Sequence, residues 1–218
     1  MFRLHLQQRG FTIVLTCLLA FTGVHSSIAQ EVVPGFAEET AKIAEALQLS
    51  AGMTVADVGA GDGKYSAFLA DQVGASGRVY ATEIDQAKVD EISKTVAGKS
   101  NVTVHLGKLD STELPDGCCD RILLRRVFHH MEKPEPMLKS LLASLKPGGQ
   151  IAIIDFLPRH DMPNQDGTPE DHEHGTSVEK LTEHLTAAGF ELFGQVDNWP
   201  SRVEHGKDID YCVLYRRP

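Results

Sequence analysis

The stretch VADVGAGDGKYS, residues 55–66, decides the fold. A short apolar run ends at Val58, glycines follow at the alternate positions 59, 61 and 63, and a helix-like pattern begins at Lys64. Glycine permits a sharp turn and lets a ligand approach the backbone closely. The start of the following helix presents unpaired amide groups and a positive dipole end to an anion. The stretch therefore predicts a strand, a nucleotide-binding turn and a helix in succession.

The glycine spacing narrows the choice of nucleotide. It is G-x-G-x-G, whereas dinucleotide folds use G-x-G-x-x-G, and Lys64 stands where the third glycine of that motif belongs. The sequence also has no Tyr-x-x-x-Lys pair, so an NAD-dependent enzyme ranks third among the interpretations. Glu83 ends the next expected strand, where a carboxylate can accept hydrogen bonds from both hydroxyls of a ribose. The alternative for Glu83 is a solvated acid at a strand end.

Strand-like and helix-like patterns alternate along the rest of the chain. The expected helices cover 36–49, 64–73, 86–98, 135–149 and 176–188, and the expected strands cover 53–58, 78–84, 101–107, 120–128, 150–156, 190–196 and 209–217. Such alternation implies right-handed crossovers and a mostly parallel sheet with helices on both faces. The last two strands have no helix between them, so we expect them to pair antiparallel at the edge of the sheet.

The first residues have the order of a secretory signal peptide. Arg3 and Arg9 precede an apolar run at 11–24, and small residues follow at Ser27 and Ala29. Cleavage after Ala29 is expected, which would export the chain to the bacterial periplasm or the medium as a single domain, residues 30–218. The apolar run is short for a bilayer, which takes about 20 residues, so an uncleaved membrane anchor is the alternative.

Composition places the chain among globular proteins. The formal net charge of −9 weighs against a nucleic-acid partner, because such proteins present a basic face. Hydrophobic residues make up 42% of the chain, which is sufficient for one domain with a full core.

Neither the cysteines nor the histidines predict a metal. Cys118 and Cys119 are adjacent, and adjacent cysteines rarely bond each other because the small ring is strained. A bond from one of them to Cys212 remains open, and a packing role is the default. The segment DHEHG at 171–175, with His160 upstream, lacks a clean third and fourth ligand, so we expect no metal site.

Five segments in this order resemble the class I S-adenosylmethionine-dependent methyltransferases. They are VADVGAGDG, VYATEID, LGKLDSTELP, DRILLRRVFHHM and LKPGGQIAIIDF. The VFHHM and LKPGG segments are most similar to the type-11 small-molecule enzymes of that class, and to exported bacterial relatives of unknown substrate. The resemblance implies a Rossmann-like sheet of seven strands in the order 3-2-1-4-5-7-6, with strand 7 antiparallel.

The resemblance also assigns cofactor roles. Asp57 and the backbone of Gly59, Ala60 and Gly61 would hold the methionine end of S-adenosylmethionine, and Tyr65 would lean over it. Farther along the chain, Glu83 would bind the ribose, Ile84 would pack against the adenine, and Asp110 would meet the adenine amino group. Where the family usually has a GDA triplet, this chain has Gly107-Lys108-Leu109-Asp110, so the acid is offset.

The acceptor side is expected after the fourth strand. Arg125 and Arg126 are adjacent, so their side chains point to opposite faces, and one of them can bind a substrate carboxylate or phosphate. A salt-bridged arginine is the alternative. His129 or His130 can serve as a base where the acceptor loses a proton. The structural alternative is a histidine ring that caps the next helix, and Asp155 is either a cleft acid or a turn residue.

The sequence therefore predicts methyl transfer from S-adenosylmethionine to a small molecule by in-line displacement. No nucleic-acid partner is expected, and no stable membrane anchor if the signal is cleaved. The alternative is an exported binding or partner protein on the same scaffold, with catalysis reduced or lost. Export keeps this alternative open, because the cofactor is made in the cytoplasm.

Overall fold

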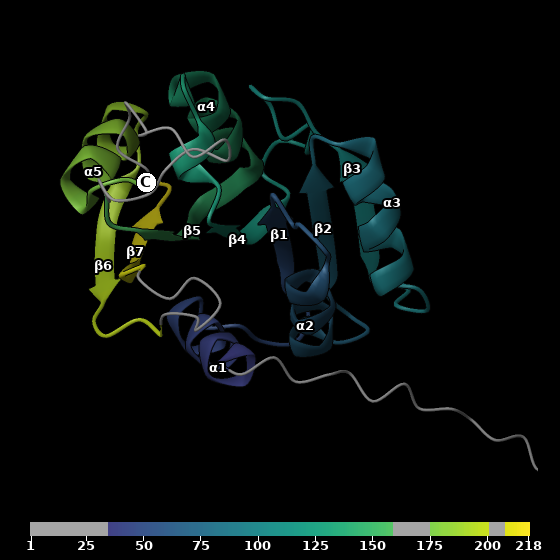
Figure 1. Ribbon diagram of the computed structural model, residues 1–218. Helices are drawn as coiled ribbons and strands as arrows, with labels where there is room; N and C mark the ends of the chain where they lie inside the picture. The colour runs from purple at the N-terminus through teal and green to yellow at the C-terminus, as the bar shows by residue number, and fades with distance from the viewer. Residues whose placement is uncertain (1–34, 159–174, 201–207) are drawn as a thin grey trace, which may run out of the picture. The chain divides into compact units, whose positions relative to one another are not determined.

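The computed structural model describes residues 35–158, 175–200 and 208–218 (Figure 1). The expected signal peptide and the three histidines of the rejected metal interpretation, His160, His172 and His174, lie outside these ranges. None of the helices within them has the length and apolar character needed to cross a membrane.

A seven-stranded sheet forms the centre of the fold, and its strand order is β3-β2-β1-β4-β5-β7-β6. The strands are β1 (Thr54–Val58), β2 (Arg78–Glu83), β3 (Val102–Leu106), β4 (Cys119–Arg125), β5 (Leu145–Phe156), β6 (Glu191–Val196) and β7 (Asp210–Arg216). The first five run parallel, and β7 pairs antiparallel with both β5 and β6. This confirms the predicted Rossmann-like order and the antiparallel last strand.

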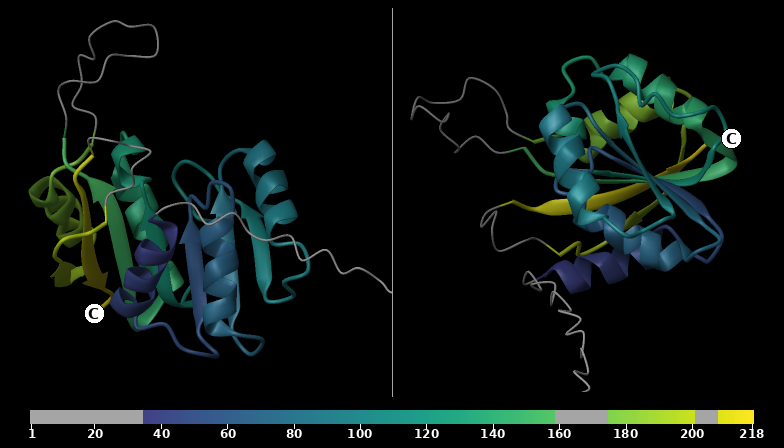
Figure 2. Two further views of the ribbon diagram at one scale, coloured as in Figure 1. Left: turned by 60° about the horizontal axis from the view of Figure 1, so that its bottom comes forward. Right: turned by 90° about the vertical axis from the view of Figure 1, so that its right-hand side faces the viewer.

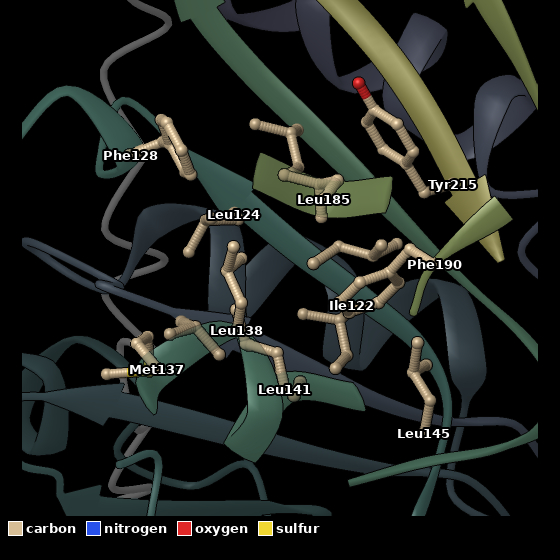
Figure 3. Packing of buried hydrophobic residues seen from close by; sticks show 14 of the residues in the cluster. Ile122, Leu124, Phe128, Met137, Leu138, Leu141, Leu145, Leu185, Phe190 and Tyr215 are labelled. Atoms are coloured by element: carbon tan, nitrogen blue, oxygen red, sulfur yellow. The ribbon is translucent and has the colours of Figure 1, made fainter. Parts of the chain in front are cut away.

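Helices cover both faces of the sheet, because successive strand residues point to opposite sides. The helices are α1 (Phe36–Ala46), α2 (Lys64–Val73), α3 (Gln86–Thr95), α4 (Pro134–Ser144) and α5 (Val178–Ala187). On one face, Leu123 of β4 joins the core beneath α1 and α2. On the other, Ile122 and Leu124 pack against Leu138 and Leu185 of α4 and α5 (Figures 2 and 3).

Several predicted boundaries were wrong. The helices expected at 36–49 and 86–98 each end three residues earlier, at Ala46 and Thr95. The helix expected at 135–149 ends at Ser144, and β5 begins at the next residue. The amphipathic pattern continues past that point, but backbone pairing overrides it: the Gly148 N–H donates to the Arg217 carbonyl at 2.9 Å, and the Arg217 N–H donates back to Gly149 at 2.9 Å. The strand expected at 120–128 stops at residue 125, and a short 3-10 turn, Phe128–His130, follows.

The described cysteines are free thiols. Cys119 begins β4 and Cys212 lies within β7, opposite Ile154 of β5. The default prediction of packing residues agrees with the burial of both side chains.

Candidate functional site

A cleft of about 490 Å³ lies at the carboxyl ends of β1, β2 and β4. This is the position at which open α/β sheets bind ligands. Most of the residues singled out from the sequence line it: Asp57, Gly59, Ala60, Gly61, Tyr65, Glu83, Ile84, Arg125, Arg126 and His130. Asp110 and His129 are absent from the lining.

The glycine loop between β1 and α2 adopts a backbone that favours glycine. Gly59, Gly61 and Gly63 have φ values of +71°, +59° and +80°. A Cβ on Gly59 would stand 2.4 Å from Cγ2 of Val127, so this glycine is required for packing against the segment after β4. A Cβ on Gly61 would meet no atom within 4 Å, so the backbone there faces open space in the cleft lining.

Glu83 ties the end of β2 to this loop. Its Oε1 accepts the Gly61 N–H at 2.9 Å, and its Oε2 accepts the Ile84 N–H at 3.1 Å. Each carboxylate oxygen has a further lone pair available as an acceptor. Ile84 presents an apolar surface beside it, with 53% of the residue exposed. The site therefore combines a fixed anionic acceptor with an exposed apolar side chain.

Asp57 lies at the end of β1, buried below the loop. The Ser66 hydroxyl donates to its Oδ2 at 2.6 Å. Burial raises the pKa of Asp57 to about 6, against the opposing effects of Ser66 and of the Arg125 charge. Sequence reasoning missed Ser66, although it stands one turn into the helix that the loop begins.

Arg125 has a buried partner that the sequence did not reveal. Its Nε and Nη2 donate to Glu39 of α1 at 2.8 and 3.1 Å. Glu39 also accepts a hydrogen bond from the Tyr65 hydroxyl, and the Trp199 Nε1–H lies 3.4 Å from its Oε1. The guanidinium lies over the Tyr65 ring, 4.7 Å from its centroid. From the sequence alone, Glu39 is one of two acids in a first helical turn.

Arg126 is held on the other side of the strand end. Its Nη2 lies 2.7 Å from Asp208 Oδ2 and 2.5 Å from Asp210 Oδ1, and its guanidinium lies 4.7 Å from the Phe156 ring centroid. Its backbone has a φ of +53°, which is uncommon for a residue with a side chain. Both arginines that were candidates for substrate binding thus contact carboxylates of the chain itself.

The two histidines take different positions. The His129 side chain is 4% exposed, its Nδ1 lies 2.7 Å from Asp155 Oδ1, and its backbone N–H donates to Asp155 Oδ2 at 3.1 Å. His130 lines the cleft, and the two imidazole centroids are 3.9 Å apart. Asp155, which the sequence left as a cleft acid or a turn residue, orients His129.

Asp110 lies on the outside of the molecule. A turn closed by the Lys108 N–H donating to the Ser111 carbonyl at 2.8 Å contains it, and its side chain is exposed. Ser111 and Thr112 line the cleft in its neighbourhood instead. Across the described parts of the chain, no three His, Cys, Asp or Glu side chains are placed to hold a metal ion.

Comparisons with known proteins agree with this architecture. Residues 56–153 match the family model described as a methyltransferase domain. The methyltransferase GfsG of Streptomyces halstedii is 31% identical over 76% of this chain and 56% of its own length. The ubiquinone/menaquinone biosynthesis C-methyltransferase UbiE of Idiomarina loihiensis is 30% identical over 48% of this chain and 43% of its own.

A solved structure matches over most of this chain. The SAM-dependent methyltransferase of Aquifex aeolicus superposes with a TM-score of 0.68 at 28% identity, over 85% of this chain and 94% of that one. By contrast, the chain spans 32% to 56% of the length of the first curated relatives that it matches.

Proposed function

Because this chain belongs to the class I S-adenosylmethionine-dependent methyltransferases, we propose that it transfers a methyl group from that cofactor to a small-molecule acceptor. The family and the fold imply S-adenosylmethionine as the cofactor. The reaction in this chain, the acceptor and the in-line geometry are parts of the proposal.

The arrangement of Glu83 and Gly61 carries the proposal. The carboxylate accepts the Gly61 N–H of the loop and the N–H of its own neighbour Ile84, beside a glycine whose missing Cβ leaves space in the cleft lining. A ribose needs a fixed acceptor for its hydroxyls, and an adenine needs an apolar neighbour such as Ile84. The residues present therefore fit an adenosyl group.

The chain contributes position and charge to the reaction. When bound, the cofactor supplies an electrophilic methyl group on a sulfonium. The residues of the chain hold the reactants in line, which is the larger part of catalysis for such a displacement. His130 lies at the cleft and can accept a proton from an acceptor that loses one. Asp155 fixes the neighbouring His129 ring.

A small acceptor fits the relatives, because the UbiE relative is named for quinone biosynthesis. The net charge of −9 weighs against a nucleic-acid substrate.

We test the proposal by calorimetric titration of the full chain with S-adenosylmethionine, S-adenosylhomocysteine and NAD. We expect both adenosyl compounds to bind and NAD not to bind. If neither adenosyl compound binds, the proposal is contradicted. Methyl-labelled cofactor, incubated with a bacterial extract and the protein, then locates the label. Label in the small-molecule fraction supports the acceptor class, and label confined to RNA or protein overturns it.

Export is a separate proposal, based on the order of residues 1–29. A periplasm-dependent reporter enzyme fused after residue 40 is expected to be active, and loss of the two arginines and the apolar run to abolish that activity. An inactive reporter fused to the intact leader contradicts export. A partner protein without catalysis remains the second interpretation, and it predicts adenosyl binding with no transfer to any fraction.

A further inference from the structure

Two adjacent thiols meet at the amino end of β4, at the end of the sheet opposite the cleft. Cys118 precedes this strand, Cys119 is its first residue, and their Sγ atoms lie 2.6 Å apart. The cleft lies at the carboxyl ends of the parallel strands, so the thiol pair is no part of the proposed cofactor site. The proposed function therefore leaves the pair unassigned.

The separation of the two sulfur atoms distinguishes between two kinds of dithiol site. The sulfur atoms of a disulfide are about 2.05 Å apart. Two thiolates on one zinc ion each lie about 2.3 Å from the metal, which places them roughly 3.8 Å from each other in tetrahedral geometry. At 2.6 Å the pair is within about half an ångström of a direct bond, and is more than about 1 Å too close for a bridging ion. The geometry favours a bond over a metal.

The backbone at the start of β4 leaves room for such a bond. Adjacent Cα atoms are about 3.8 Å apart, less than the usual spacing across a disulfide, so a bond between neighbours strains the small ring that it closes. The regular pairing of β4 with β5 is interrupted here, because Cys119 pairs with Leu145 whereas Arg121 pairs with Gln150. This interruption constrains the backbone of Cys119 less than a regular ladder does. The strain also makes the bond easier to reduce than an ordinary disulfide, which favours a reversible site.

The third described cysteine is not placed to compete for this bond. Cys119 lies in the core between the sheet and the helices α4 and α5, and Cys118 packs against the same core. Cys212 lies in the core on the other face, beneath α1 and α2. The sheet thus separates Cys212 from the pair. Among the described cysteines, the partner of each adjacent thiol is the other one.

The two thiols differ in access and in acidity. Cys119 is fully buried, whereas Cys118 is partly exposed. The hydrogen bond from the Cys119 thiol lowers the pKa of Cys118, and the Lys146 ammonium acts in the same direction. The same hydrogen bond, together with burial, raises the pKa of Cys119. Because the thiolate is the attacking species in thiol exchange, Cys118 is the thiol that meets an oxidant first.

We propose that Cys118 and Cys119 are a site of reversible oxidation, in which a low-molecular-weight disulfide converts the two thiols into a vicinal disulfide. The Cys118 thiolate attacks one sulfur of the oxidant, forms a mixed disulfide with it and releases the other half as a thiolate. The Cys119 thiol then loses its proton, attacks the sulfur of Cys118 and releases the second half. The protein loses two protons and two electrons, and the oxidant becomes two thiols.

The experiment exposes the full chain to oxidised glutathione, in a Cys17→Ser background that leaves the three described cysteines. After N-ethylmaleimide has blocked the remaining thiols, trypsin releases residues 109–121, which contain Cys118 and Cys119 and no other cysteine. Mass spectrometry is expected to find this peptide two hydrogens lighter than its dithiol form and without maleimide, and dithiothreitol is expected to restore the dithiol form. A peptide that keeps both thiols, carries glutathione as its final product or is joined to a Cys212 peptide overturns the proposal.

Single substitutions in the same background assign the two roles. In Cys119→Ala the glutathione adduct on Cys118 is expected to be at least about tenfold more abundant than in the parent, because no second thiol displaces glutathione. Cys118→Ala is expected to take up no glutathione, because the remaining thiol of the pair is buried. Cys212→Ala is the matched control, since it removes a buried thiol of β7 and leaves the oxidation of the pair unchanged. An adduct in Cys118→Ala as abundant as that in Cys119→Ala overturns the assigned order.

Unfolding shows whether the fold brings the thiols together. The Cys17→Ser protein in urea is expected to form about tenfold less of the vicinal disulfide, because the unfolded chain does not hold the two sulfur atoms in contact. An unfolded chain that is oxidised to the same extent overturns the inference. This comparison holds even where thermal melting shows that Cys119→Ala does not fold. No adenosyl ligand enters any of these measurements, so the thiol site and the proposed function stand or fall separately.

Discussion

At the scale of single residues, Asp57 couples stability to pH. Its pKa of about 6 exceeds the ordinary value of 3.8 because it is buried, so folding disfavours its charged form. The cost is present at pH values above 6, shrinks as pH falls from 6 towards 4, and is absent below the unfolded value. Asp57→Asn is expected to raise the free energy of unfolding by up to about 3 kcal/mol at pH 8, and by little at pH 4. Urea denaturation at both pH values checks this, and an equal change at both contradicts it.

Glu83 is the second residue with a defined expectation. Glu83→Gln keeps an acceptor for the Gly61 N–H but loses the charge, so affinity for S-adenosylhomocysteine is expected to fall about tenfold or more. Glu91→Gln on α3 is the matched control, because Glu91 is exposed and pairs with Lys88. Calorimetry measures the affinity of both variants for S-adenosylhomocysteine. A Glu83→Gln chain that binds as tightly as the control refutes the ribose role.

Most residues of the cleft could be predicted from the sequence, but the residues that they contact could not. Asp57 and Glu83 were predictable because one acid is the penultimate residue of β1, before the glycine loop, and the other is the last residue of β2. Glu39 was not, since its partner lies 86 residues away in the chain and nothing local distinguishes it from an exposed helical acid. The acid–arginine contact exists only once α1 packs on the sheet.

At the scale of elements, the loop between β1 and α2 offers a matched pair of substitutions. Gly59→Ala combines a left-handed backbone with a Cβ 2.4 Å from Val127, whereas Gly61→Ala meets no neighbour. Gly61→Ala is expected to cost about 1–2 kcal/mol of stability, and Gly59→Ala about 1–3 kcal/mol more. Thermal melting compares them, and equal melting temperatures contradict the packing argument.

The Gly59→Ala and Gly61→Ala variants also distinguish an effect on packing from an effect on ligand binding. Val127→Ala should restore part of the stability of Gly59→Ala, because it removes the methyl group in conflict. Gly61→Ala is expected to weaken adenosyl binding more than its small effect on stability suggests, since its Cβ enters the space beside Glu83. A double variant no more stable than Gly59→Ala counts against the assigned contact.

Element boundaries were predictable where local pattern and pairing agree. The helix 64–73 has the bounds of α2. The helix expected at 135–149 failed because Leu145 fits either an amphipathic helix or a buried strand, and pairing with β4 and the residue after β7 decides between them. The second of these partners, Arg217, lies about seventy residues downstream of Gly148, so no local pattern reveals the pairing.

At the scale of the whole molecule, Trp199 reports on the integrity of the fold. It is the single tryptophan of the chain, is 6% exposed, and packs in a cluster that joins α1 and α2 to five strands of the sheet. Its fluorescence and the far-UV circular dichroism are therefore expected to change at the same denaturant concentration. A fluorescence transition that precedes the loss of helix shows that this face loosens independently.

The position of β7 has a consequence for how the molecule is made. This strand follows all the others in the sequence, yet it lies inside the sheet, between β5 and β6. While the ribosome still holds residues 208–218, β6 has no strand to join and the edge of β5 stays uncovered. The sheet is therefore completed only once β7 has also left the ribosome. Until then, the open β5 edge presents unpaired backbone N–H and C=O groups that a chaperone can bind.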